Sequence, residues 1–306
     1  MIENQTWFVI INPTSGNGSS QRKWPKIQQL LLDYGFVFEF EFTKHPAHSI
    51  ELLHESVNQG VSKIICVGGD GTIHNIVNGI MAQNVFQTSK INLGVIPIGT
   101  GNDWVKTYGI SLDIEKAIQC IKNGDLKHQD VGKIELTNQE REPIYFNNLA
   151  GVGFDGYVVS KVQKYKKLGA LAYIFGALMG MLSAKNFQSK TTFNSEVYSK
   201  KTLMILIGLC QYSGGGMQLT KEPNPSDGYF DISIAENFKG FDILKNLFAL
   251  FSGKITNSKK IITAKTNQIK IEVIDKTLPF IQADGELIGQ GDFKCSIIPK
   301  ALSFYA

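Results

Sequence analysis

The chain has few cysteines and little net charge. Its four cysteines, among 306 residues, lie far apart and form no Cys-x-x-Cys pair. We therefore expect no disulfide framework and no cysteine-based zinc site, but reduced thiols of a cytoplasmic protein. The net charge of only +4 argues against a protein dedicated to nucleic acid, although it allows attraction to nucleotides or anionic lipid surfaces.

The sequence also lacks a clear membrane-spanning or secretory segment. The uncharged stretch Leu168–Ala184 is shorter than the roughly 20 apolar residues that cross a bilayer, and it contains three glycines and a serine. We predict a core or interfacial helix there. The first five residues contain no basic region leading into an apolar one, so no secretory signal is expected.

The most informative stretch is an apolar run that enters a glycine cluster. Ile64–Val67 has the pattern of a strand buried on both faces, and Gly68, Gly69 and Gly71 then surround Asp70. Apolar residues at 73, 76, 77 and 80 have helical spacing. A strand, a glycine turn and a helix together form a geometry that binds phosphate. No Gly-Lys-Ser/Thr follows, so this is not a Walker loop, and Asp70 would need a cation or a proton-bearing group between itself and a phosphate.

Two other predicted strands end in loops of the same kind. Trp7–Ile11 runs into Asn12–Gly18, and Leu93–Ile96 runs into Pro97–Asp103. Each loop alone is also compatible with an ordinary connection. Because open α/β sheets bind ligands at the carboxyl edge of their strands, we expect the three loops to lie side by side.

The order of predicted elements divides the chain into two domains. Residues 1–129 alternate strand and helix, which predicts a doubly wound parallel α/β domain. Residues 130–306 contain many short strands, which predicts an antiparallel sandwich or barrel whose last strand could return to the first domain. We expect the two domains to abut and form a cleft. Predicted helices are Ser19–Tyr34, starting or kinked at Pro25, Ser49–Asn58 and Asp113–Asn123, with helical insertions at Tyr157–Ala184 and Phe241–Ser252. Further predicted strands are Phe36–Phe42, Val131–Leu136, Ile144–Leu149, Thr191–Val197, Leu203–Leu209, Tyr229–Ala235, Ile269–Ile274, Phe280–Ala283 and Phe293–Ile298.

Three further groups of polar residues have a functional and a plain interpretation. Asp284-Gly285-Glu286 places two carboxylates at i and i+2, on one face if the chain is extended, but Asp-Gly is also a common hairpin turn. Asn224–Tyr229 has the composition of a turn before a strand. His45 and His48 flank a proline turn with no third ligand nearby in sequence, so we predict surface residues and not a metal site.

Several of these motifs, taken together and in this order, resemble the diacylglycerol kinase catalytic-domain family, which includes soluble bacterial lipid kinases and sphingosine and ceramide kinases. The motifs are Asn12-Pro13-x-Ser15-Gly16, Gly68-Gly69-Asp70-Gly71-Thr72, Pro97-x-Gly99-Thr100-x-Asn102-Asp103, Asp227-Gly228-Tyr229-Phe230-Asp231 and Asp284-Gly285-Glu286. The resemblance covers nearly the whole chain. It implies a first domain like that of NAD kinase and phosphofructokinase and a β-sandwich second domain. The implied activity is ATP-dependent phosphorylation of a lipid hydroxyl, with diacylglycerol converted to phosphatidic acid.

The resemblance also implies roles for individual residues, with ATP and Mg²⁺ as cofactors. Catalytic roles fall on Asp70, Asp284 and Glu286, with Glu286 as the proton acceptor assisted by Asp284, although the sequence does not rank the two. A structural Mg²⁺ would be held by Asp227 and the backbone carbonyls of Asn224 and Tyr229, which suits a hard cation. At position 74 this chain has histidine where the family usually has asparagine. Nucleotide contacts would come from Asn12, Pro13, Thr14, Ser15, Gly16, Thr43, Gly68, Gly69, Asp70, Gly71, Thr72, Ile73, His74 and Thr100.

The expected partner is a lipid substrate at a membrane surface, reached from the cytoplasm by a peripherally associated protein. Leu168–Ala184, with lysines at 161, 164, 166 and 167 before it, could dock on an anionic bilayer or be a buried helix. An NAD kinase, the first alternative, normally lacks the Pro-x-Gly-Thr-x-Asn-Asp segment. A non-catalytic lipid- or nucleotide-binding regulator, the second alternative, would have no reason to retain Asp70, Asp284 and Glu286. The oligomeric state stays open, and a homodimer is one possibility.

Overall fold

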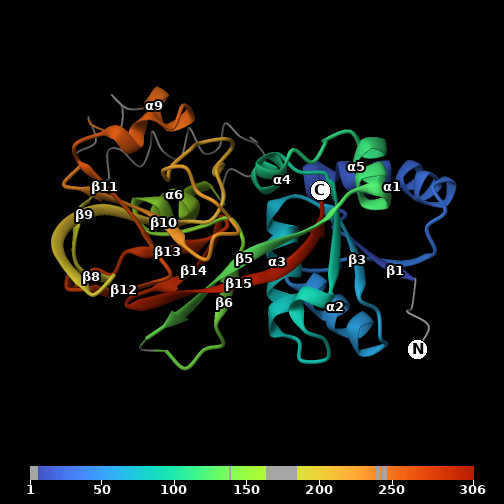
Figure 1. Cartoon of the computed structure of the whole chain (residues 1–306), viewed down its shortest axis with the longest axis horizontal. Helices are drawn as coiled ribbons and strands as arrows, with labels where there is room; N and C mark the ends of the chain where they lie inside the picture. Colours follow the sequence, from blue (N-terminus) through green and yellow to red (C-terminus); the bar gives the residue numbers. More distant parts are fainter. Residues whose placement is uncertain (1–5, 138, 163–184, 239–241, 243–246) are drawn as a thin grey trace. The chain divides into compact units, whose positions relative to one another are not determined.

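The computed structural model describes residues 6–137, 139–162, 185–238, 242 and 247–306 (Figure 1). The chain forms two compact units, Met1–Gln129 with Lys300–Ala306, and Asp130–Pro299. Strands β5 (Leu126–Leu136) and β15 (Phe293–Tyr305) each carry the chain from one unit to the other. The segment Leu168–Ala184, predicted to be a core or interfacial helix, lies outside the described residues.

The first unit is built on a parallel sheet with the strand order β2-β1-β3-β4, which confirms the predicted α/β class. Residues 303 and 304 of β15 add a further parallel strand beside β4. The central strands are almost wholly apolar and buried, because helices cover both faces of such a sheet. The strands are β1 (Trp7–Ile11), β2 (Phe38–Phe42), β3 (Lys63–Gly68) and β4 (Asn92–Pro97).

The helices of this unit divide between the two faces of the sheet (Figure 1). Val9 and Val67 pack in one core cluster with residues of α1 and α5. The alternate residues Ile10 and Cys66 are just as buried and point to the opposite face, where α2 packs on α3. The helices are α1 (Ser15–Asp33), α2 (His48–Asn58), α3 (Asp70–Ala82), α4 (Asp103–Tyr108) and α5 (Ile114–Asn123), with a 3-10 turn η1 (Thr88–Lys90).

Three details of the first unit differ from the sequence-based expectations. The chain is already helical before Pro25, so the helix does not start there, and its non-helical residues are Gly16, Asn17 and Gly18, with φ of 58°, 55° and 78°. Strand β2 begins at Phe38 and not at Phe36. Helix α4 was not predicted, because six residues are too few to show helical periodicity.

The second unit is an antiparallel β structure, as predicted. Strand β9 pairs with β7, β8 and β10, and β10 pairs in turn with β11. Strand β12 joins β8 to β15, and β13 joins β7 to β14. The strands are β5 (Leu126–Leu136), β6 (Ile144–Phe146), β7 (Leu149–Gly153), β8 (Phe187–Phe193), β9 (Glu196–Gly208), β10 (Phe230–Glu236), β11 (Ile261–Thr266), β12 (Gln268–Val273), β13 (Phe280–Ala283), β14 (Glu286–Gln290) and β15 (Phe293–Tyr305).

Several strand boundaries predicted in this unit are wrong. The predicted strand Ile144–Leu149 is two strands, and residues 151–154 form the end of β7 and the start of α6. Gly151 lies inside β7, and a Cβ there would lie 2.9 Å from a Leu206 methyl group, so this position in the strand favours a residue without a side chain. The predicted strand Thr191–Val197 runs across the turn of the β8–β9 hairpin, whose turn residues Asn194 and Ser195 both have positive φ. The predicted strand Leu203–Leu209 coincides with the second half of β9, which begins earlier, at Glu196. Strands β11 and β14 were not predicted.

The described helical segments of the second unit are short. They are α6 (Phe154–Val162), α9 (Leu247–Phe251) and a 3-10 turn, η3 (Lys254–Asn257). Across the described parts of both units, no helix has the length and apolar character needed to cross a membrane.

Candidate functional site

The predicted ligand loops of the first unit contact one another at the carboxyl ends of their strands. The Asn12 side-chain amide donates a hydrogen bond to Thr72 Oγ1 at 3.0 Å, and Ser15 Oγ lies 3.5 Å from the same oxygen. The Asn12 side-chain oxygen accepts from the Thr14 N–H and hydroxyl at 3.1 and 2.9 Å. The loop after β1 is thereby joined to the start of α3.

The loop after β4 lies equally close to the loop after β3. The Ile98 N–H donates to the Gly68 carbonyl oxygen at 2.8 Å. A Cβ on Gly99 would lie only 2.7 Å from Gly69 Cα, so a side chain at 99 could not be accommodated without moving the backbone. Thr100 is exposed beside this contact, and Thr43 follows β2 with its N–H bonded to the Ile11 carbonyl oxygen at 2.8 Å. These loops therefore present backbone and small side chains at one edge of the sheet.

Asp70 begins α3 and holds the start of α4. Its Oδ1 accepts the Trp104 N–H at 3.2 Å. Burial and, secondarily, the negative charge of Asp103 raise the pKa of Asp70 from 3.8 to about 6, although backbone N–H groups at 102–104 oppose this rise. Asp103 is 4% exposed and bonded to Lys106 Nζ at 3.2 Å.

Two carboxylates so close in a buried position favour a bound cation. The position of a Cβ on Gly101 would lie 2.9 Å from Asp70 Oδ2 and 3.6 Å from Asp103 Oδ2, so both oxygens approach the same point. Oxygen donors of this kind suit Mg²⁺, which commonly binds one or two carboxylates together with nucleotide phosphates. The residues present at Asp70 and Asp103 therefore fit a magnesium–nucleotide site.

Ile73 and His74, like Thr72, are predicted nucleotide contacts whose side chains are buried. Ile73 is 1% exposed, and its N–H is bonded to the Gly69 carbonyl oxygen at 3.1 Å. His74 is 6% exposed and its Nε2 lies 3.4 Å from the Asn78 side-chain amide, one turn further along α3. Both side chains belong to the packing of the helix.

The structure adds two residues that the sequence-based site omitted. Asp103 was quoted only as part of a motif, and its partnership with Asp70 depends on how α4 lies against α3. Arg22 Nη1 donates to the Asn17 carbonyl oxygen at 3.2 Å, which places a guanidinium group at the left-handed turn after β1. Arg22 lies within the predicted helix Ser19–Tyr34, and no motif in the sequence marked it as a site residue.

In the second unit, Asp284-Gly285 is the two-residue turn between β13 and β14. Both residues have positive φ, 51° and 82°, and Ala283 pairs with Glu286 across the turn. The motif therefore forms a hairpin turn, as its plain interpretation predicts, and does not adopt the extended conformation that would place both carboxylates on one face. Glu286 is half-buried as the first residue of β14.

The Asp284 carboxylate is held by backbone amides from another part of the chain. Its Oδ2 accepts the Asn147 N–H at 3.1 Å, and its Oδ1 accepts the N–H groups of Asn148 and Leu149 at 2.9 and 3.1 Å. The Asp284 N–H donates back to the Leu149 carbonyl oxygen at 2.9 Å. The acid thus fixes the turn to the segment that connects β6 and β7.

A second polar contact supports the same turn. The Gln282 side-chain oxygen accepts the Gly285 N–H at 2.8 Å, and its amide nitrogen donates to Asp155 Oδ2 at 2.5 Å. Burial raises the pKa of Asp155 from 3.8 to about 6, and the Gln282 hydrogen bond opposes this rise. Neither Gln282 nor Asp155 was among the predicted site residues.

The segment predicted to hold a structural Mg²⁺ has a lysine in contact with its acid. Lys265 Nζ lies 2.7 Å from Asp227 Oδ2, while Asp227 Oδ1 accepts the Tyr229 N–H at 3.0 Å. The Asn224 side-chain oxygen accepts the Ser226 N–H at 3.1 Å. Both Asp227 oxygens are therefore engaged by the chain itself.

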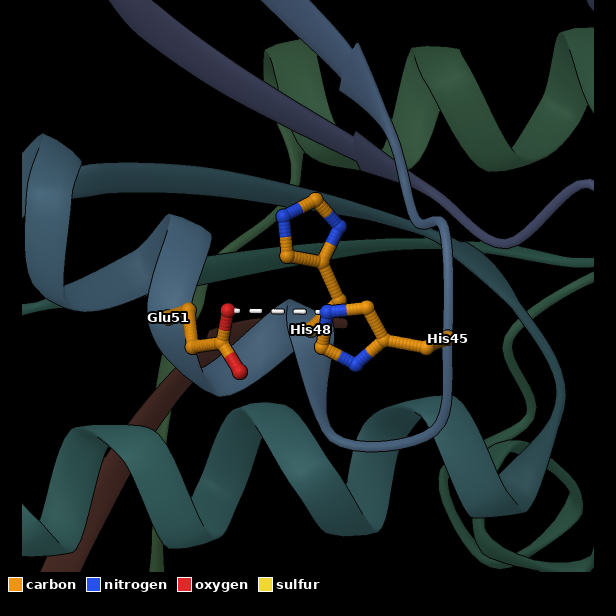
Figure 2. Close-up of side chains that lie close together, drawn as sticks. All are labelled: His45, His48 and Glu51. Atoms are coloured by element: carbon orange, nitrogen blue, oxygen red, sulfur yellow. Dashed lines mark ion pairs between the residues drawn. The ribbon is translucent and has the colours of Figure 1, made fainter.

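The expectation that His45 and His48 have no third ligand nearby is wrong, because Glu51 joins them (Figure 2). His45 Nε2 lies 3.7 Å from Glu51 Oε2, and His48 is buried and not a surface residue. His48 Nδ1 accepts the Lys44 N–H at 3.0 Å, so its neutral ring carries the proton on Nε2. Because neither His48 nitrogen then has a lone pair to spare, the group favours the direct contact of His45 with Glu51 over a shared metal.

Both parts of the chain match known protein families. Residues 6–134 match the diacylglycerol kinase catalytic domain, and residues 148–306 match the YegS C-terminal NAD kinase beta sandwich-like domain.

The chain is similar over nearly its whole length to known kinases. It is 28% identical to a diacylglycerol kinase of Bacillus subtilis, covering 93% of this chain and 91% of the relative, and 27% identical to one of Staphylococcus saprophyticus, covering 92% and 89%. A crystal structure of a diacylglycerol kinase from Bacillus anthracis shares the fold, with a TM-score of 0.74 at 22% identity over 99% of this chain and 97% of that one. The chain therefore belongs to the bacterial diacylglycerol and lipid kinase family, with a diacylglycerol kinase catalytic domain followed by a YegS-type C-terminal domain.

Proposed function

We propose that this protein is an ATP-dependent kinase that transfers the γ-phosphate to a lipid hydroxyl, with diacylglycerol as substrate and phosphatidic acid as product. The observation that carries this proposal is the set of three contacting loops around Asp70 and Asp103 in a chain of this family. The first unit (1–129 with 300–306) would be the nucleotide-binding domain. The second unit (130–299) would be the lipid-substrate domain.

The loops of the first unit would bind and position the nucleotide. Backbone amides and the hydroxyls of Thr72 and Thr100 would hold phosphate oxygens, since no Walker lysine is present. Arg22 would add positive charge at the turn after β1. Bound Mg²⁺ would neutralise charge on the triphosphate, and Asp70 and Asp103 would hold it there. Positioning and charge neutralisation are most of what phosphoryl transfer requires of a protein.

Glu286 would be the base. The lipid oxygen forms a bond to the γ-phosphorus, the bond from that phosphorus to the bridging oxygen breaks, and ADP leaves with the electron pair. The hydroxyl proton passes to the Glu286 carboxylate. Asp284 is less suited to this step, because its oxygens already accept three N–H groups that a proton would have to displace. We therefore assign Asp284 to holding the turn.

Transfer of label from γ-labelled ATP tests the reaction. The purified protein with Mg²⁺ and diacylglycerol in detergent micelles should yield labelled lipid, and parallel reactions should contain NAD or other lipids. Label in NAD would replace the proposal with an NAD kinase, and no transfer to any acceptor would favour a binding protein. Glu286→Gln should lose turnover while still binding ATP.

We also propose peripheral association with the cytoplasmic face of a membrane, where the lipid substrate lies. The support is the lipid-kinase family and the lysine-flanked apolar sequence at 161–184. A high-salt wash should release the protein from membranes, and a requirement for detergent would contradict this proposal.

A further inference from the structure

Lys265 and two aspartates form a compact charged cluster in the second unit. Asp231 on β10 and Lys265 on β11 are directly paired across the two strands. Lys265 Nζ lies 3.5 Å from Asp231 Oδ2 as well as 2.7 Å from Asp227 Oδ2. One ammonium group therefore contacts both acids.

The two acids need a positive charge at this point. The Asp231 side chain is 6% exposed and that of Asp227 is 25% exposed, so water screens them poorly. Asp231 Oδ2 accepts no hydrogen bond from any residue in the described part of the chain. The ammonium of Lys265, itself 47% exposed, supplies the charge that faces this oxygen.

The same cluster closes the loop that precedes β10. Asp227 Oδ1 accepts the Tyr229 N–H, and Asp130 Oδ2 accepts the Gly228 N–H at 2.7 Å. The Asp130 N–H donates to the Pro225 carbonyl oxygen at 2.8 Å. The loop at 224–229 is thus tied down by side chains and amides of the chain, with a cation already present among them.

We propose that Lys265 takes the place of the structural Mg²⁺ that the family resemblance implies for this loop. Residues 224–231 then fold without a divalent metal, and the protein needs Mg²⁺ only with its nucleotide. The residues present do not fit the metal, because one oxygen of its acid ligand is paired with an ammonium group and the other accepts a backbone N–H. The part of this inference that concerns residues 224–231 is independent of the proposed lipid-kinase activity.

Metal content and urea unfolding of the full-length protein, without nucleotide, test the proposal. After dialysis against EDTA, the wild-type protein should contain no stoichiometric metal. Added Mg²⁺ or Ca²⁺ should shift the urea midpoint of the wild type no more than it shifts the midpoint of Asp227→Asn. Lys265→Met should lower the midpoint in EDTA, because it leaves two acids without a cation. Mg²⁺ or Ca²⁺ should then raise the midpoint of this variant, since a divalent ion can enter the vacated position.

A matched control is available on β12. Lys270 is 46% exposed and lies 3.0 Å from Glu272, so Lys270→Met removes a similar lysine from a strand ion pair. It should show no response to metal beyond that of the wild type.

Two results would overturn the proposal. The first is a metal-dependent rise of the wild-type midpoint that Asp227→Asn abolishes and Asp70→Asn does not, because the metal would then be in this loop. The second is a Lys265→Met protein whose midpoint ignores both metals. If that variant does not fold, the wild-type comparison alone still decides between the lysine and a metal.

Discussion

The different roles of Asp284 and Glu286 can be separated by two isosteric substitutions. Asp284→Asn keeps the shape of the side chain, and asparagine tolerates the left-handed φ of 51° that this residue adopts. If the amide oxygen takes the place of Oδ1, the bonds from Asn148 and Leu149 remain but lose their charge assistance. The amide nitrogen then faces the Asn147 N–H, so one bond is lost and two donors oppose each other.

The expected cost follows from these contacts. Hydrogen bonds to a charged group contribute roughly 1.5–3 kcal/mol each, and leaving a buried donor unpaired costs about 1–3 kcal/mol. We therefore expect Asp284→Asn to reduce the free energy of unfolding by about 2–4 kcal/mol, together with a loss of turnover. Glu286→Gln should change that free energy by less than about 1 kcal/mol. It should nevertheless lower kcat by roughly 100-fold or more, the usual contribution of a general base.

Urea unfolding and steady-state kinetics on the same preparations measure both effects. Glutamate-to-glutamine exchange at Glu142, an exposed residue, provides a control that should change neither quantity. The reasoning would be refuted by an Asp284→Asn protein as stable as the wild type. Near-normal turnover of Glu286→Gln would equally refute the assignment of the base.

Three further predictions concern the residues around these sites. The pKa of Asp155 is about 6 in the folded protein, against an ordinary value of 3.8, so the folded state binds more protons than the unfolded state between these pH values. The free energy of unfolding should therefore fall as pH rises through this range, by at most about 3 kcal/mol. Asp155→Asn should still accept from Gln282 and should flatten that part of the stability–pH curve in urea titrations, whereas an unchanged slope would show that Asp155 is not its source. Gly99→Ala should weaken ATP binding in calorimetry, because its Cβ would lie 2.7 Å from Gly69 Cα and must move one loop, and unchanged affinity would contradict the close packing of the loops. Arg22→Ala should raise the KM for ATP about tenfold with little change in kcat, the loss expected for one charged phosphate contact, and an unchanged KM would place Arg22 outside the nucleotide site.

Much of the first unit could be predicted because its signals are local. Four consecutive apolar residues at 64–67 and the spacing of 73, 76, 77 and 80 correctly indicated β3 and α3, since periodicity is a property of neighbouring residues. Glycines at 68, 69 and 99 marked the loops for a similar reason, as turns and close approaches demand a residue without a side chain. The second unit was predicted less well. Its 13-residue strand β9 pairs with different neighbours along its length, and nothing within β9 itself encodes those partners.

By itself the sequence predicted the fold class and the three loops of the first unit, and it marked the acids at positions 70, 284 and 286 as candidate site residues. Only the tertiary structure decided what those acids contact. Asp284 bonds to amides 135–137 residues away, and Lys265 reaches Asp227 from 38 residues further along the chain. Such contacts depend on which strands become neighbours and in which register. That is set by the packing of the whole unit, whereas turn propensity and periodicity act over only a few residues.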